Sequence, residues 1–234
     1  MKKLFAWGSN TRTTDMGQRR KGLAALLMIA CTLGIAVHSQ AQTLTPPTTP
    51  TLITPPEGST GFLVGHALGT QGYVCLPTSE GASTASWTVN NARPEATLFT
   101  DVFGQQIQII THFLSPNTHP NKFAPSPLAF GNATWQSSFD SSKVWAQTVH
   151  AIPPDANTPS CPNTGSIACL LLQVIGADQG PAGGKFLTQT SFIQRLNTKG
   201  GSAPATGCSV SSDVGKQALV PYSADYFFFR GGVE

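Results

Sequence analysis

Short apolar or alternating runs, separated by turn residues, follow one another from residue 61 to the end of the chain, a pattern typical of strands. The clearest alternation lies in Gln105–Leu114, where isoleucine alternates with glutamine and His112 falls on the polar face. The run Ala168–Ile175 is apolar on both faces and predicts a central strand. Lys185–Asn197 predicts a long strand with a bulge, because its apolar positions change parity along the run.

Two more strands are expected on either side of a turn at Leu68, Gly69 and Thr70. These two and the remaining expected strands occupy residues 61–67, 71–76, 85–89, 96–100, 132–136, 143–150 and 225–230. Helical periodicity is almost absent, and the low content of charged residues, 11%, disfavours long solvated helices. About ten short, mostly antiparallel strands predict an all-β sandwich or barrel, with few or no long helices. We expect it to form a single domain over residues 61–234.

The residues before this domain divide into two segments. Residues 1–41 have the order of a signal peptide: a basic start, an apolar run from Leu23 to Val37, and small residues before a cleavage site after Ala41. Residues 42–60 are rich in Pro and Thr and predict an extended tail. No later apolar run reaches the about 20 residues of a membrane helix, so no integral membrane span is expected after cleavage. We expect export to the periplasm or the cell exterior.

Signal cleavage also reverses the sign of the net charge. The full chain carries +3, but six of its 14 Lys and Arg residues and only one of its 11 Asp and Glu residues precede residue 42. The mature chain therefore carries −2. A chain with this balance offers no basic surface to nucleic acid, and no nucleic-acid partner is expected.

Four cysteines remain after signal cleavage, an even number that predicts disulfides in an exported protein. Three pairings are possible. We favour a short loop between Cys161 and Cys169 together with a long tie between Cys75 and Cys208. The alternative is a four-cysteine metal site, and the absence of close Cys-x-x-Cys pairs counts against it.

Several short motifs between His66 and Arg230 together resemble the domain of unknown function 3455 family. The strongest matches are Ile193–Thr198, Gly200–Gly201, Gly207–Cys208, Val220–Tyr222 and Ala224–Tyr226. The resemblance implies a secreted protein of bacteria or fungi and indicates little about activity. The chain departs from the family pattern at residues 115–134, where a segment rich in Pro and Asn lengthens the passage from His112 to Trp135. A longer loop at this place is expected to reshape any site near His112.

Seven polar residues in or beside the expected strands are candidates for a ligand site or a structural junction: His66, His112, Asp140, Arg195, Asn197, Tyr222 and Asp225. Arg195 is the most informative, because a buried guanidinium needs a partner. Its structural interpretation is an ion pair with Asp225 or Asp140, and its functional interpretation is a fork for a carboxylate or a sugar. Four aromatic residues either fill the core or line a cleft for a small molecule or carbohydrate: Tyr222, Tyr226, Trp135 and Trp145.

Motifs for catalysis and cofactor binding are missing from the sequence. It contains neither a G-x-S-x-G nucleophile motif nor a G-x-G-x-x-G nucleotide motif, and no cofactor or metal is predicted. We therefore favour a non-enzymatic, disulfide-stabilised β domain with a binding or structural role at the cell surface or in the periplasm. The alternative is an extracytoplasmic hydrolytic or metal-dependent enzyme that uses His66, His112, Asp140 and Arg195, which requires these four side chains to converge. The sequence leaves the oligomeric state open.

Overall fold

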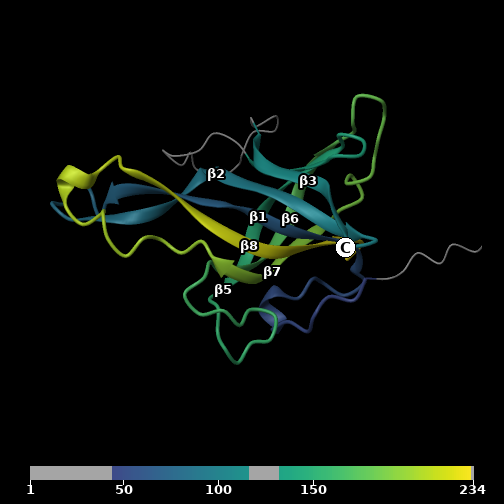
Figure 1. Ribbon diagram of the computed structural model, residues 1–234, viewed down its shortest axis with the longest axis horizontal. Helices are drawn as coiled ribbons and strands as arrows, with labels where there is room; N and C mark the ends of the chain where they lie inside the picture. The colour runs from purple at the N-terminus through teal and green to yellow at the C-terminus, as the bar shows by residue number, and fades with distance from the viewer. Residues whose placement is uncertain (1–43, 116–131, 233–234) are drawn as a thin grey trace, which may run out of the picture. The chain divides into compact units, whose positions relative to one another are not determined.

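Eight antiparallel strands form a closed barrel in the computed structural model, which describes residues 44–115 and 132–232 (Figure 1). Each strand pairs with the next along the chain, and β8 returns to pair with β1. The strands are β1 (Thr60–Pro77), β2 (Ala85–Val102), β3 (Gln105–Ser115), β4 (Asn132–Ser137), β5 (Lys143–Ile152), β6 (Cys169–Asp178), β7 (Phe192–Gly200) and β8 (Gln217–Arg230). Helix in the described residues is limited to two single turns, η1 (Thr51–Ile53) and η2 (Ser211–Asp213). The all-β prediction is confirmed.

Two strands are longer than the sequence predicts. β1 runs without a break through the expected turn around Gly69, and β2 joins the two strands expected at 85–89 and 96–100. Gly69 serves the sheet rather than a turn, because a Cβ atom there would lie 2.1 Å from the carbonyl oxygen of Glu95 on β2. The glycine therefore allows a close approach between neighbouring strands. Because expected strands merge in this way, eight strands replace the about ten that the turn signals predicted.

A bulge in β3 overturns the predicted face of His112. The register between β2 and β3 shifts at Ile109, and Ile109 and Ile110 are both buried. Beyond the bulge the parity is reversed, so His112 faces the barrel interior instead of the polar outer face. The expected long strand at 185–197 is also shorter in the structure, because residues 185–190 form turns and β7 begins at Phe192.

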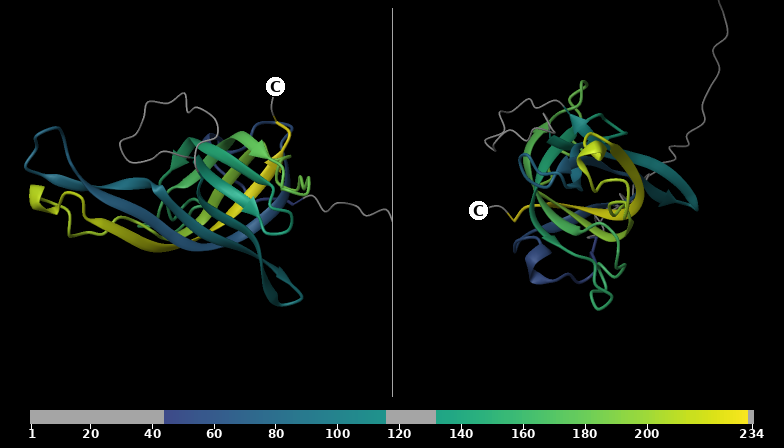
Figure 2. Two further views of the ribbon diagram at one scale, coloured as in Figure 1. Left: turned by 90° about the horizontal axis from the view of Figure 1, so that it is seen from above. Right: turned by 90° about the vertical axis from the view of Figure 1, so that its left-hand side faces the viewer.

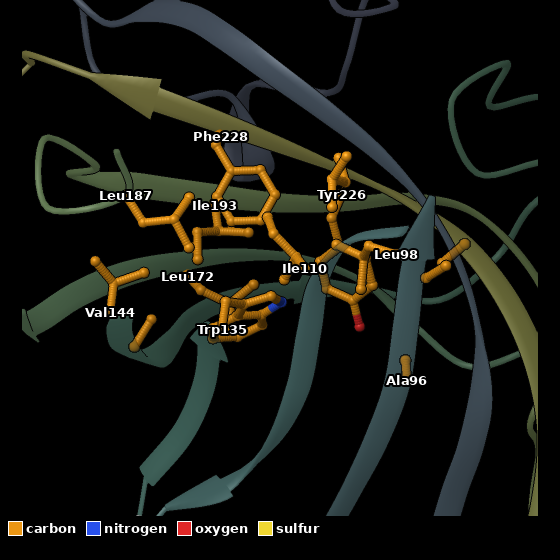
Figure 3. Packing of buried hydrophobic residues seen from close by; sticks show 14 of the residues in the cluster. Ala96, Leu98, Ile110, Trp135, Val144, Leu172, Leu187, Ile193, Tyr226 and Phe228 are labelled. Carbon is orange, nitrogen blue, oxygen red and sulfur yellow. The ribbon is translucent and has the colours of Figure 1, made fainter. Parts of the chain in front are cut away.

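Apolar side chains fill one end of the barrel, which we call the closed end. Figure 3 shows Val144, Leu172, Ile193 and Phe228 meeting there from four strands. Leu187, from the connection between β6 and β7, is fully buried among them and covers this end. The apolar core therefore lies inside the barrel, and toward its other end polar side chains join the apolar ones.

A second apolar cluster lies on the outer face of β6, β7 and β8. Ile53, from the N-terminal segment, is fully buried there against Leu171, Leu196 and Phe229. The buried side-chain amide of Gln194 donates a hydrogen bond to the carbonyl oxygen of Ile53 at 2.6 Å. The segment before β1, predicted as an extended tail, is thus packed on the barrel wall, because Ile53 and the partly buried Leu44 contact the outer apolar cluster.

Parts of β1, β2 and β8, together with the connection between β7 and β8, extend beyond the barrel as an arm, formed by residues 72–94 and 203–219 (Figure 2). The disulfide Cys75–Cys208 joins the two parts of the arm, with the Cα atoms 5.5 Å apart. The second disulfide, Cys161–Cys169, lies in the outer apolar cluster. Both predicted pairings are confirmed, and the protein is a disulfide-stabilised β domain.

Two predictions concern residues outside the described part of the chain. These are the signal peptide over residues 1–41 and most of the inserted segment over residues 115–134. Both remain predictions. In residues 44–115 and 132–232, no helix is long and apolar enough to cross a membrane.

Candidate functional site

The polar end of the barrel contains a cavity of about 670 Å³. Its wall combines apolar side chains with a cation, an imidazole and aromatic rings, chiefly those of His112, Trp135, Leu170, Leu172, Arg195 and Tyr226. Leu172, Trp135 and Tyr226 also belong to the apolar core, so they form the boundary between the cavity and the closed end. Figure 3 shows Trp135 and Tyr226 among the side chains of the apolar core, and their ring centroids are 5.8 Å apart.

Arg195 places its charge in this cavity without a neutralising carboxylate. Its Nε and Nη2 atoms donate to the carbonyl oxygen of Ala168 at 3.2 and 2.9 Å, which holds the side chain against the connection before β6. In the described part of the chain, no Asp or Glu forms an ion pair with Arg195. The Nη1 amino group therefore remains available to a ligand. The predicted ion pair with Asp225 or Asp140 is wrong, because both carboxylates have other partners.

His112 is neutral at physiological pH, with a defined tautomer. Burial is the main cause that lowers the pKa of its imidazole to about 4; the hydrogen bond to Thr134 raises the pKa, and the charge of Arg195 lowers it further. The Nδ1 atom lies 2.9 Å from the carbonyl oxygen of Thr134, which can only accept, so Nδ1 carries the proton. The Nε2 atom of the neutral ring is therefore a hydrogen-bond acceptor.

Two tyrosines and a tryptophan complete the polar character of the cavity. The hydroxyl groups of Tyr222 and Tyr226 lie 3.0 Å apart. Burial, followed by the neighbouring Tyr226, raises the pKa of Tyr222 well above its usual value, so this phenol keeps its proton. The Nε1–H group of Trp135 is buried and has no hydrogen-bond acceptor among the described residues. The indole of Trp135 stacks on the His112 ring, with centroids 4.1 Å apart and planes 11° apart.

Three of the predicted site residues meet on the outer face of the barrel instead. His66 Nδ1 lies 2.6 Å from Asp225 Oδ1, and Asn197 Nδ2 donates to Asp225 Oδ2 at 2.8 Å. His66 and Asp225 are directly opposed on β1 and β8, which explains their contact. Asn197 joins them because the β7–β8 register shifts beside it and its backbone takes the left-handed conformation, with φ of 51°. This group is a junction of three strands.

Asp140 belongs to neither group and lies at the closed end. Its carboxylate accepts hydrogen bonds from the Phe186 amide at 2.8 Å and from the amide and hydroxyl of Ser142 at 3.1 and 2.7 Å. Burial by itself would raise the pKa of Asp140, but these hydrogen bonds and one from Ser137 together lower it to about 2. Asp140 therefore fastens the connection that carries Phe186 and Leu187 over the end of the barrel.

The four residues of the enzyme hypothesis do not converge. His112 and Arg195 face the cavity, His66 lies outside the barrel with its side chain 57% exposed, and Asp140 fastens the closed end. In the described part of the chain, no group of three His, Cys, Asp or Glu side chains is placed to hold a metal ion.

The four aromatic residues predicted to fill the core or line a cleft are divided between the two places. Trp135 and Tyr226 line the cavity and Tyr222 adjoins it through its hydrogen bond to Tyr226, whereas Trp145 packs against Gly176. The sequence reasoning missed Tyr73 as a further lining residue, whose hydroxyl donates to the Gly201 carbonyl oxygen at 2.6 Å. Treating 61–77 as one strand would have placed Tyr73 on the inward face, in step with the small inward residues before it.

A comparison with protein families places this chain. Residues 55–230 match the family of proteins of unknown function DUF3455. Because the match covers most of the chain, the protein belongs to this family, as the motifs between His66 and Arg230 predicted. No curated protein and no solved structure matches the chain.

Proposed function

We propose that this DUF3455 member is an exported, non-enzymatic binding protein that holds a small organic acid inside its barrel. The observation that carries the proposal is the guanidinium of Arg195, which lies in a cavity and has no carboxylate partner in the described residues. Arg195 is partly buried, and a charge with reduced access to water gains from a partner of opposite charge. A ligand carboxylate supplies the missing partner, since the guanidinium fork matches its two oxygens.

The second donor for this carboxylate is the phenol pair. One hydroxyl of Tyr222 and Tyr226 donates to the other, which leaves the second proton without an acceptor among the described residues. Tyr226 is directly opposite Arg195 in the β7–β8 register and lines the same cavity. A carboxylate bound at Arg195 is therefore expected to accept a hydrogen bond from Tyr226 as well.

The rest of the wall indicates an amphipathic ligand. Leu170 and Leu172 on β6 contribute apolar surface to the cavity wall. Trp135 and Ile175 add further apolar surface. A volume of about 670 Å³ falls within the about 300–1,000 Å³ of small-molecule sites. An acid with one apolar ring or a short chain fits both properties, whereas a sugar leaves the apolar wall unmatched.

Two features support an extracytoplasmic location, in the periplasm or at the cell surface. The predicted signal peptide over residues 1–41 is the first. The second is the pair of disulfides, which persist in oxidising compartments. Edman sequencing of the exported protein is expected to begin at Gln42, and an uncleaved cytoplasmic product would contradict the assignment.

The binding proposal is tested by calorimetric titration of the oxidised mature protein with phenylacetate and octanoate. Each acid is compared with its methyl ester, which keeps the apolar part and removes the negative charge. The esters are expected to bind at least about ten-fold more weakly, because a hydrogen bond to a charged group contributes about 1.5–3 kcal/mol. Equal binding of acid and ester, or no binding of either acid, would overturn the proposal.

Two arginine variants complete this test. Arg195→Met removes the guanidinium from the cavity and is expected to abolish the preference for acid over ester. Arg230→Met is the matched control, because Arg230 is exposed at the end of β8 and contacts Gln189 outside the cavity. The control is expected to retain the preference, and its loss in both variants would argue against a specific role for Arg195.

A further inference from the structure

The cavity contains a hydrogen-bond acceptor as well as a cation, and this acceptor restricts the ligand further. The Nδ1 proton of His112 is occupied by the carbonyl oxygen of Thr134. The Nε2 atom on the other side of the ring has no hydrogen-bond partner among the described residues. An imidazole fixed in this way accepts one hydrogen bond and offers no donor.

The surroundings of His112 keep this acceptor in place. Trp135 is opposite His112 in the β3–β4 register and stacks on the imidazole, and Tyr226 lies against the ring with a centroid distance of 5.7 Å. His112 is only 5% exposed, and the charge of Arg195 opposes its protonation. Protonation of Nε2 is therefore unfavourable in the ligand-free protein, and the lone pair is available at neutral pH.

Trp135 adds an unsatisfied donor to the same part of the wall. Its buried Nε1–H group has no acceptor among the described residues, although most buried polar groups in proteins are paired. The stacked pair of His112 and Trp135 thus leaves one acceptor and one donor unmatched. The Trp135 donor is enclosed by protein, so the accessible unmatched group is His112 Nε2, and a hydroxyl is a small ligand group that can donate to it.

We infer that the ligand is a hydroxy acid with an apolar ring or chain, whose carboxylate binds Arg195 and whose hydroxyl donates to His112 Nε2. This inference rests on the proposed function, because it assigns a second polar contact to the same ligand. A carboxylic acid without a hydroxyl would leave the His112 acceptor without a partner on binding. A site built to bond a hydroxyl discriminates strongly against analogues that lack it.

The test uses three acids of nearly equal size: mandelate, its O-methyl ether and phenylacetate. Mandelate can donate from its hydroxyl, the ether can only accept, and phenylacetate can do neither. With the oxidised mature protein, mandelate is expected to bind at least about ten-fold more tightly than the ether and phenylacetate. The reason is that neither of these two acids can donate the buried hydrogen bond to His112 Nε2. Equal affinity of the three acids would overturn the inference and leave the proposed function intact. If none of the three acids binds and octanoate does not bind either, the proposed function itself is overturned.

Variants and a spectroscopic measurement assign the preference to His112. His112→Phe keeps an aromatic ring beside Trp135 and removes the acceptor, so mandelate and phenylacetate should bind with similar affinity. His66→Phe on the outer face is the matched control and should keep the wild-type ratio. If the His112 variant does not fold, the imidazole nitrogen-15 spectrum of the wild-type protein tests whether the ligand hydroxyl donates to His112 Nε2. The Nε2 resonance of His112 should shift with mandelate and stay in place with the ether, and an identical response to both would overturn the assignment.

Discussion

His66 and His112 lie on opposite faces of the same barrel wall, and their surroundings differ in every respect that decides their chemistry. His66 is largely exposed and bonds Asp225, whose second oxygen is held by Asn197. His112 is buried, has no carboxylate partner and faces the charge of Arg195 in the cavity. Polar groups on the outer face satisfy one another, whereas those in the cavity leave donors and an acceptor unmatched.

This contrast separates structural residues from binding residues. The outer-face group joins β1, β7 and β8, and its loss should lower the stability of the fold without changing the cavity. The inner polar groups His112 and Arg195 face the cavity, and their changes should alter ligand binding. The four predictions below test this separation, beginning with the largest expected effect on unfolding.

Acidification should lower the stability of the fold through His112. The pKa of His112 is about 4 in the folded protein, against an ordinary value of 6.5, so the unfolded chain takes up the proton first as pH falls. Stability is therefore lost as the pH falls from 6.5 to about 4, by about 3 kcal/mol in total. Urea unfolding of the wild-type protein at several pH values measures this slope.

Two glutamine variants separate the histidines in that experiment. His112→Gln should flatten the slope between pH 6.5 and 4, whereas His66→Gln should retain it. The low pKa of Asp140, about 2, affects stability only at lower pH, because its contribution is lost as the pH falls from 3.8 through 2. A His112→Gln protein as acid-sensitive as the wild type would contradict the assignment.

Removal of the outer-face disulfide should come next in magnitude. The paired substitutions Cys161→Ala and Cys169→Ala open a loop with a sequence separation of 8 residues. The chain-entropy model gives a loss of about 2–3 kcal/mol for a loop of this size. Denaturant unfolding measures the loss, and titration with phenylacetate should give the wild-type affinity while the protein remains folded. A changed affinity of the folded variant for phenylacetate would show that the outer-face disulfide also affects the cavity.

Removal of the Asp225 carboxylate should lower the free energy of unfolding by less than removal of the disulfide. Asp225→Ala removes the hydrogen bonds to His66 and Asn197, and we expect a loss of about 1 kcal/mol because the group is partly exposed. A double-mutant cycle with Asn197→Ala isolates the part that belongs to this pair. Additive losses would show that the two side chains do not support each other.

The smallest expected effect on stability belongs to Arg195. Arg195→Met removes two hydrogen bonds to Ala168 together with an unpaired cation, and these contributions oppose each other. The free energy of unfolding should therefore change by less than about 1 kcal/mol. A larger loss would indicate that Arg195 is mainly a structural residue, as the ion-pair interpretation of the sequence supposed.

Several parts of the structure could be predicted from local patterns. The strand expected at 132–136 is β4, Asn132–Ser137, because a short run between turn signals leaves little freedom in its bounds. The pairing of Cys75 with Cys208 was the favoured one of three possible pairings, and the structure confirms it. By contrast, the face of His112 was mispredicted, since a bulge at Ile109 reverses the parity without an obvious signal in the sequence.

The cavity could be predicted only in part, because its residues come from distant strands. Arg195 was singled out as a buried cation, yet its surroundings depend on β3, β4, β6 and β8 closing around it. Tyr73 was missed because the expected turn at Gly69 concealed the continuity of β1. Close packing against β2, rather than a local turn preference, is the reason for that glycine.

The all-β class and the family could be recognised from the sequence, since they depend on residue types and local alternation, whereas the disulfide pairing was only the favoured one of three until the structure confirmed it. The tertiary structure alone decided that His66 and Asp225 meet outside and that Arg195 and His112 meet inside. The physical reason is that strands alternate their side chains with a period of two, so each bulge exchanges the faces of all later residues. The closure of eight strands then determines which inward residues share one cavity.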